Sequence, residues 1–310
     1  MKRSARVLAA LAFGLASTGG GIACEGRQVS SPALIDEVLC VPDGPSRIVT
    51  LDPFYTLLMA GELNLPVIGT ALSGEAMPTQ VEDSWDTMPE VVGQMTSPNL
   101  EAILRLDPDL IIGDAYSQAE IYGQLSEIAP TALVDTTDWK EYFRAVALVA
   151  DAGEAAEAKL DAYEARVAET AAALPDEATV SFLRIIPGGF QVYVAGPAAY
   201  APMSVLTELG IERPPFETAT DDTVLKRPTM EGLLELEGDI LIYTIGGAHH
   251  EGDAIALENE VTSSAIWQAL PSVQNGRAYR VKPTHWMGFG GLASAHAIVD
   301  DVREIFGLEE

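Results

Sequence analysis

Basic residues are scarce in this sequence. Its 310 residues include 18 Lys and Arg against 46 Asp and Glu, which gives a formal net charge of −28 at pH 7. A surface of this sign repels nucleic acid and anionic membranes, so both are poor partners, and we expect no binding of nucleic acid. Such a charge more often reflects a heavily solvated exterior, and less often a site for cationic ligands.

Long hydrophobic runs are also missing. The apolar stretch over residues 7–16 is about half of the roughly 20 residues that a membrane-spanning helix needs. It follows Lys2, Arg3 and Arg6 and precedes a series of small residues, which is the layout of a secretory signal peptide. We therefore expect residues 1–23 to be a signal peptide and the mature protein to be exported.

Cysteine is nearly absent as well. Cys24 and Cys40 are the two cysteines, and both lie shortly after the expected signal peptide. In an oxidising compartment they favour an intramolecular disulfide, and closing a loop of about 15 residues is worth roughly 3 kcal/mol. The alternative is a lipid anchor at Cys24, because Ile22, Ala23 and Cys24 partly resemble a bacterial lipobox, although Gly21 stands where that motif normally has Leu.

Motifs of common enzyme classes are not present. The chain has no Gly-x-Ser-x-Gly, no Gly-Lys-Ser/Thr phosphate loop, no His-Glu-x-x-His, and no Gly-x-Gly-x-x-Gly after its first strand. His249, His250 and Glu251 are compact, but adjacent side chains point apart and a closed metal site needs further ligands. We expect no enzymatic activity and no permanently bound cofactor, and His249 and His250 are weak candidates for metal ligation.

Strand and helix patterns alternate along the chain. Short apolar runs predict strands at 47–51, 67–71, 110–113, 131–135, 179–185, 190–195, 240–244 and 277–281. Helical patterns separate them, which indicates βαβ units on a parallel sheet and an α/β fold. The segment 139–174 is rich in Ala, Glu, Lys and Leu, with Gly153 as its single interruption. We expect an N-terminal α/β lobe at 24–138, an interdomain helix at 139–174 and a C-terminal α/β lobe at 175–310.

Aromatic residues follow several of these strands. Ligands of open α/β sheets bind outside the carboxyl ends of the strands, so the loops at this edge are the expected site. A single aromatic residue there is more often half-buried packing, but the group as a whole favours a cleft for a flat or aromatic ligand. The candidate ligand contacts of this kind are Tyr55, Trp85, Tyr116, Tyr200 and Trp286.

Two further candidate features are cationic. Arg184 lies inside or at the end of an apolar strand, where an unpaired guanidinium is costly, so it needs an anionic partner from the protein or from a ligand. Lys226 and Arg227 form an adjacent basic pair beside Pro228. In so acidic a chain, a local positive patch marks a docking point for an anionic group.

Several segments together resemble a known family. Residues 45–52 (PSRIVTLD) look like its first strand, and residues 98–112 (PNLEAILRLDPDLII) look like its most recognisable block. Residues 128–131 and 292–301 agree in order. Over about residues 42–308, the chain resembles the periplasmic substrate-binding proteins of ABC importers for iron siderophores, haem and cobalamin.

The resemblance implies a fold and a role. The fold is two Rossmann-like lobes joined by a single long rigid helix, the class III arrangement with a helical backbone, and the ligand lies between the lobes. The role is capture of a ferric siderophore in the periplasm, with iron carried as the chelate, and delivery to ABC transporter permease subunits. Glu101 and Glu231 match the family positions that contact the permease. Cys24 and Cys40 resemble a cysteine pair that staples the mature N-terminus in one subgroup, and we expect a monomer.

The resemblance also assigns roles to cleft residues. Arg184 is similar to a second-lobe arginine used by many siderophore binders, and Trp286 to a cleft aromatic near the C-terminus. We expect Arg184, with Arg227 or Lys226, to face the negative charge of the chelate. Hydroxamate binders carry an arginine about where Met95 stands, which weakens a hydroxamate assignment.

Other cargoes and another class of protein remain as alternatives. Haem binders usually present a Tyr or His axial ligand, and Tyr116, His249 and His250 keep that alternative open. A cobalamin carrier has the same fold. From another class, an exported metal-dependent enzyme on a similar two-lobed scaffold is the less favoured alternative.

Overall fold

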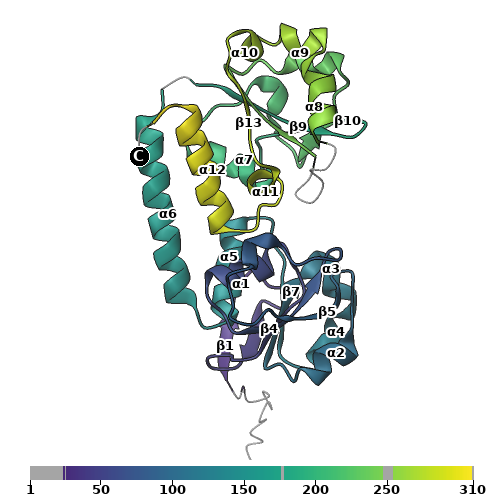
Figure 1. Ribbon diagram of the computed structural model, residues 1–310. Helices are drawn as coiled ribbons and strands as arrows, with labels where there is room; N and C mark the ends of the chain where they lie inside the picture. The colour runs from purple at the N-terminus through teal and green to yellow at the C-terminus, as the bar shows by residue number, and fades with distance from the viewer. Residues whose placement is uncertain (1–23, 25, 176–177, 247–253, 309–310) are drawn as a thin grey trace, which may run out of the picture.

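The computed structural model describes residue 24 and residues 26–175, 178–246 and 254–308. Figure 1 shows two α/β lobes joined along one side by a long helix, α6 (Gly153–Ala173). This confirms the predicted two-lobed arrangement. The expected signal peptide at 1–23 and the metal candidates His249 and His250 lie outside the described residues. Within the described ranges, no helix combines the length and apolar character needed to cross a membrane.

The N-terminal lobe is built on a six-stranded sheet with the order β6-β5-β4-β3-β7-β8. Its strands are parallel, except that β6 runs antiparallel to β5. The central strands are buried almost throughout, as in parallel sheets covered by helices. The strands are β3 (Ile48–Thr50), β4 (Val67–Leu72), β5 (Glu90–Gln94), β6 (Ser97–Pro98), β7 (Leu110–Asp114) and β8 (Thr131–Val134), and the α-helices are α1 (Thr56–Glu62), α2 (Leu100–Arg105), α3 (Ala115–Gln118) and α4 (Tyr122–Ser126).

The C-terminal lobe has a five-stranded sheet with the order β11-β10-β9-β12-β13. This sheet is mixed, because β9, β10 and β11 are antiparallel while β9, β12 and β13 are parallel. The strands are β9 (Val180–Ile186), β10 (Gly189–Tyr193), β11 (Leu225–Lys226), β12 (Ile240–Ile245) and β13 (Ala278–Arg280). The helices are α7 (Ala201–Glu208), α8 (Ala254–Thr262), α9 (Ala265–Ala269), α10 (Pro271–Gln274), α11 (Pro283–Trp286) and α12 (Leu292–Ile305).

The segment expected as one interdomain helix contains two helices. The first, α5 (Trp139–Val149), packs on α1 and β8 of the N-terminal lobe, and α6 alone runs between the lobes. The break lies at Asp151, whose φ of 59° is left-handed and cannot continue a helix. Arg27 stabilises the end of α5, because its guanidinium donates to the backbone oxygens of Leu148 and Val149 at 3.1 and 3.4 Å.

A short β-hairpin lies near the start of the described residues. It consists of β1 (Arg27–Ser30) and β2 (Val38–Val41), which pair antiparallel. Cys24 and Cys40 form a disulfide beside it, with their Cα atoms 5.6 Å apart. The predicted disulfide is therefore confirmed, and the Cys24 sulfur is occupied by this bond.

The two lobes meet in a continuous apolar core. One cluster of buried side chains extends from the N-terminal lobe through α5 and α6 to α12 and the C-terminal sheet. Within it, the Trp139 ring packs edge-on against Tyr163 of α6, with ring centroids 5.4 Å apart, and against Phe289, with centroids 5.6 Å apart. The relative position of the lobes is therefore maintained by side-chain packing between them as well as by the connecting helix.

Candidate ligand-binding cleft

A cavity of about 500 Å³ lies where the two lobes face each other. Its N-terminal wall includes Asp52, Tyr55, Met95, Asp114, Tyr116, Trp139 and Tyr142, and its C-terminal wall includes Ala199, Tyr200, Val224, Met287 and Phe289. Asp52 follows the carboxyl end of β3, and Asp114 is the last residue of β7. The cavity therefore occupies the sheet edge at which ligands of open α/β sheets are expected.

Three of the five predicted aromatic contacts line this cavity: Tyr55, Tyr116 and Tyr200. The Tyr116 side chain is 98% exposed, so its ring is available to a ligand. Tyr200 donates from its hydroxyl to the backbone oxygen of Met287 at 3.0 Å, which joins two segments of the C-terminal wall. Tyr55 packs on Tyr142 with ring centroids 5.3 Å apart.

The sequence also places Trp85 and Trp286 at the cleft, and the structure places neither there. Trp286 is fully buried, stacks on Phe182 with ring centroids 5.0 Å apart, and donates to the Asp301 carboxylate at 2.8 Å. The short helix α11 turns this side chain into the core beneath β9. Trp85 is half-buried and its indole N–H donates to the backbone oxygen of Leu65 at 2.7 Å.

Sequence reasoning missed four aromatic residues that do line the cavity: Phe54, Trp139, Tyr142 and Phe289. Trp139 and Tyr142 lie in the first turn of α5, which follows β8 and was assigned to the interdomain helix. Phe289 lies in a glycine-rich stretch, and its neighbour Gly290 lets the chain approach the N-terminal lobe. A Cβ atom there would lie 2.5 Å from the backbone oxygen of Phe54.

None of the three cationic candidates is among the residues that line the cavity. Arg184 is half-buried; its Nε donates to the backbone oxygen of Gly246 at 2.7 Å, and one Nη donates to Gln191 at 3.0 Å and to the Tyr193 hydroxyl at 3.3 Å. The sequence predicts an anionic partner for Arg184, but its hydrogen-bond partners among the described residues are neutral groups of the protein.

The basic pair points elsewhere. Lys226 donates to the backbone oxygen of Phe216 at 2.6 Å, and its ammonium lies over the Phe216 ring. Arg227 is exposed. Neither side chain contributes to the cavity wall.

Two carboxylates that sequence reasoning did not select lie in the wall. Asp52 is buried and accepts hydrogen bonds from the backbone N–H groups of Phe54, Tyr55 and Thr56 at 3.2, 2.7 and 2.8 Å. Asp114 caps α3 by accepting from Ser117 N–H at 3.2 Å. Burial raises the pKa of both carboxyl groups, and the negative charge of Asp52 raises the pKa of Asp114 further.

Three phenols of the wall are held as neutral groups. Burial raises the pKa of Tyr55, Tyr142 and Tyr200 above the ordinary value, and nearby carboxylates add to the effect at Tyr55 and Tyr142. The Tyr142 hydroxyl shares a hydrogen bond of 2.7 Å with Thr56. These three groups line the cavity without adding charge to it.

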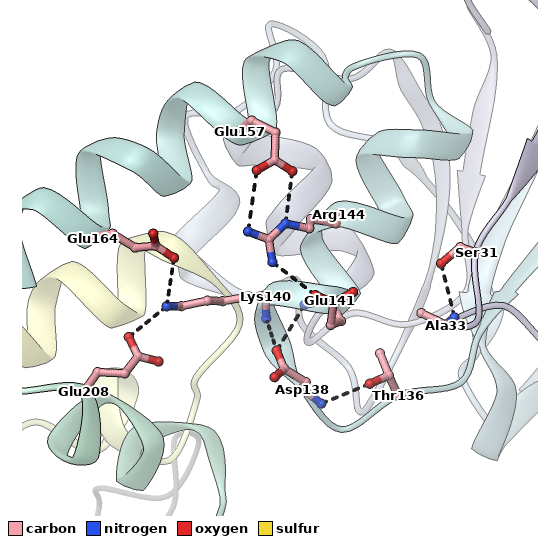
Figure 2. Close-up of polar contacts among 10 residues, drawn as sticks. All are labelled: Ser31, Ala33, Thr136, Asp138, Lys140, Glu141, Arg144, Glu157, Glu164 and Glu208. Carbon is pink, nitrogen blue, oxygen red and sulfur yellow. Dashed lines mark hydrogen bonds and ion pairs between the residues drawn. The ribbon is translucent and has the colours of Figure 1, made fainter.

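Polar contacts cross the lobe junction beside the cavity (Figure 2). Lys140 of α5 lies between Glu164 of α6 and Glu208 of α7, with nitrogen-to-oxygen distances of 3.3 and 3.0 Å. Asp138 caps α5 by accepting from Lys140 and Glu141 N–H at 2.9 and 3.1 Å. Tyr163 donates to the Glu208 carboxylate at 2.9 Å. The ammonium of Lys140 is therefore paired with carboxylates at the lobe junction.

The two expected permease contacts lie on different lobes and are both exposed. Glu101 lies in the first turn of α2, which is capped by Asn99 accepting from Ala102 N–H at 3.0 Å. Glu231 begins a short 3₁₀-helix over Glu231–Glu235.

Two α/β lobes with a cavity between them, joined by one helix, define a solute-binding protein. A model of the periplasmic binding protein family matches residues 48–284, and the chain belongs to this family.

Relatives of known name span most of the chain. The probable siderophore-binding lipoprotein YfiY of Bacillus subtilis (strain 168) is 29% identical over 282 residues, which are 86% of this chain and 84% of that protein. The Fe(3+) dicitrate-binding periplasmic protein FecB of Escherichia coli (strain K12) is 28% identical over 268 residues, 84% of this chain and 85% of that protein.

Solved structures show the same fold. Staphylococcus aureus SirA complexed with staphyloferrin B superposes with a TM-score of 0.72 at 23% identity, covering 91% of this chain and 99% of that one. The iron-uptake system-binding protein FeuA from Bacillus subtilis gives a TM-score of 0.74 at 19% identity, covering 90% of this chain and all (100%) of that one.

Proposed function

We propose that this protein captures a ferric siderophore between its lobes and presents it to the permease of an ABC importer. The observation that carries the proposal is the cavity of about 500 Å³ at the lobe junction, with aromatic side chains on both walls. A cavity of this size matches a small chelate, and mainly apolar pockets with a few polar groups are typical of ligand sites. The names of the relatives, which include siderophore and ferric citrate binders, support this cargo.

Delivery would use the exposed carboxylates of the two lobes. Glu101 and Glu231 are separated by the cleft, since one lies on each lobe, and both face solvent. Exposed charges of this kind steer association and fix orientation more than they add to folding stability. Each carboxylate would pair with an arginine of one permease subunit.

The disulfide supports a location outside the cytoplasm. The bond between Cys24 and Cys40 requires oxidising conditions, which exist outside the bacterial cytoplasm. The names of the relatives, a periplasmic protein and a lipoprotein among them, agree with this location. We place the protein in the periplasm as a binding protein without enzymatic activity.

A fluorescence titration tests the proposal. Trp139 and several tyrosines line the cavity, so binding of a coloured ferric chelate should quench the intrinsic emission. Tyr116→Ala should weaken binding of that chelate, because the exposed ring of Tyr116 lies in the wall. The matched control is Tyr122→Ala, since Tyr122 contacts Asp36 at 2.6 Å and is not among the lining residues. Saturable quenching by haem or a corrinoid, with none by any ferric siderophore, would overturn the cargo assignment.

A further inference from the structure

The described part of the cavity wall carries negative groups and no positive ones. Of the described residues that line it, two are carboxylates, Asp52 and Asp114, and none is Lys, Arg or His. This is unexpected for a protein that would bind an anionic chelate, because the ligand would enter a chain of net charge −28 without a cation to meet it.

The sheet register brings the two carboxylates to one place. β3 and β7 are neighbouring parallel strands in which Thr50 pairs with Ile112. Asp52 and Asp114 each lie two residues beyond this pair, so they leave the sheet side by side at its carboxyl edge. The negative charge of Asp52 raises the pKa of Asp114, which agrees with this proximity.

Nearby cations are bound to other protein groups. Arg184 donates to Gly246, Gln191 and Tyr193. Lys140 lies between two carboxylates of the junction, and its ammonium lies over the Trp139 ring, 5.7 Å from the ring centroid. Turning either side chain toward a ligand would break hydrogen bonds in a half-buried setting, which is costly.

The aromatic side chains of the wall independently favour a cationic ligand. Tyr116, Trp139 and Phe289 line the cavity together with the three neutral phenols described above. The face of an aromatic ring is electronegative and attracts cations, and of these three rings that of Tyr116 is the exposed one. Aromatic faces beside carboxylates are the usual surroundings of an ammonium group.

From these observations, and on the basis of the proposed function, we propose that the cavity selects ferric chelates of zero or positive net charge and discriminates against anionic ones. A chelate with a pendant amine would place its ammonium against Asp114 and the Tyr116 ring. Asp52 is tied to three backbone N–H groups, so Asp114 would be the main specificity-determining carboxylate.

A series of ligands with one iron centre tests this directly. Ferrioxamine B is positively charged, its N-acetyl derivative is uncharged and its N-succinyl derivative is negatively charged, while the trihydroxamate iron site is unchanged. Ferric dicitrate and a ferric tris-catecholate extend the series to other anionic chelates. We expect affinity to decrease from the cationic to the uncharged and then to the anionic hydroxamate, and we expect both other anions to bind more weakly than ferrioxamine B.

Asp114→Asn assigns the effect to one side chain. Asparagine also caps helices through its side-chain oxygen, so the contact with Ser117 should survive. The variant should lose about five- to tenfold in affinity for ferrioxamine B, as expected for one charge pair in a partly hydrated site, and should hardly change for the acetylated form. Asp86→Asn is the matched control, because Asp86 is exposed in the same lobe and is not among the lining residues.

The outcomes separate the two proposals. Binding of an anionic member as tightly as ferrioxamine B, or equal losses for all ligands in Asp114→Asn, would overturn the charge selectivity and leave siderophore capture intact. Failure of every ferric chelate in the panel to bind would contradict both.

Discussion

The carboxylate of Glu62 accepts a hydrogen bond of 2.7 Å from the backbone N–H of Ala293, and a second of 3.1 Å from Leu292 N–H. Glu62 ends α1 in the N-terminal lobe, and these two N–H groups belong to the first turn of α12. A carboxylate at a helix N-terminus is stabilised by the unpaired N–H groups there. This contact holds the chain that follows Phe289, and so fixes one wall of the cavity to the opposite lobe.

Glu62 should make stability depend on pH. Burial raises its pKa from the ordinary value of 4.5 to about 7, although the two N–H groups and the charge of Lys159 on α6 act in the opposite direction. The folded state therefore holds a proton that the unfolded state releases, so this group's contribution to stability falls as the pH rises from 4.5 to about 7. The full effect is on the order of 3 kcal/mol.

Glu62→Gln should remove this dependence, because glutamine does not titrate. In urea unfolding at pH 5 and pH 8, the variant should gain stability relative to the parent protein as the pH is raised. Other titrating groups contribute equally to both proteins, so the comparison isolates Glu62. Parallel stability curves for the two proteins would show that this carboxyl group titrates normally.

Trp286 should matter for folding rather than for binding. Trp286→Phe keeps a ring on Phe182 but removes the donor to Asp301 and leaves this acceptor in a half-buried position. We expect a loss of about 1–3 kcal/mol in unfolding free energy, with unchanged affinity for the ferric siderophore. Thermal or urea unfolding measures the first effect and quenching titration the second. Weaker binding by a fully folded variant would return Trp286 to the cleft.

Features with a local sequence pattern were predictable, and features that depend on distant contacts were not. The strand around Leu110–Asp114 and the cleft at the carboxyl edge of the sheet were predicted. Buried strands appear in the sequence as short apolar runs, and the alternation of strands with helices indicates a parallel sheet. The break after α5 was not, since Arg27 supports it from more than a hundred residues away. Likewise, Trp286 and Phe289 are three positions apart in the chain, but packing against distant side chains decides which of the two lines the cavity.

The disulfide should stabilise the N-terminal region. Cys24 and Cys40 are separated by 16 positions, and a loop of similar length is worth roughly 3 kcal/mol in the chain-entropy model. We expect no reactive thiol in the denatured, unreduced mature protein, and a lower unfolding midpoint after reduction. Cys24→Ala with Cys40→Ala should behave like the reduced protein. A mass that shows acyl chains on Cys24, with Cys40 free, would instead identify a lipoprotein.

The permease contacts should be separable from ligand binding. Charge reversal at exposed positions such as Glu101 and Glu231 should change stability by no more than about 0.5 kcal/mol. The double variant Glu101→Lys, Glu231→Lys should keep its siderophore affinity but abolish uptake and stimulated ATP hydrolysis in vesicles that contain the permease. Glu127→Lys with Glu235→Lys is a control with the same charge change at exposed sites on the two lobes. Normal transport by the first variant would contradict the docking role.

Native mass spectrometry tests the central claim most directly. The mature protein, purified from iron-starved cells that make their own siderophores, would be measured intact and after denaturation. We predict a complex of one protein with one ferric chelate, whose released mass and iron isotope pattern identify the siderophore, and a reduced bound fraction in Tyr116→Ala. Protein that carries haem, a corrinoid or no ligand at all under these conditions would contradict the account.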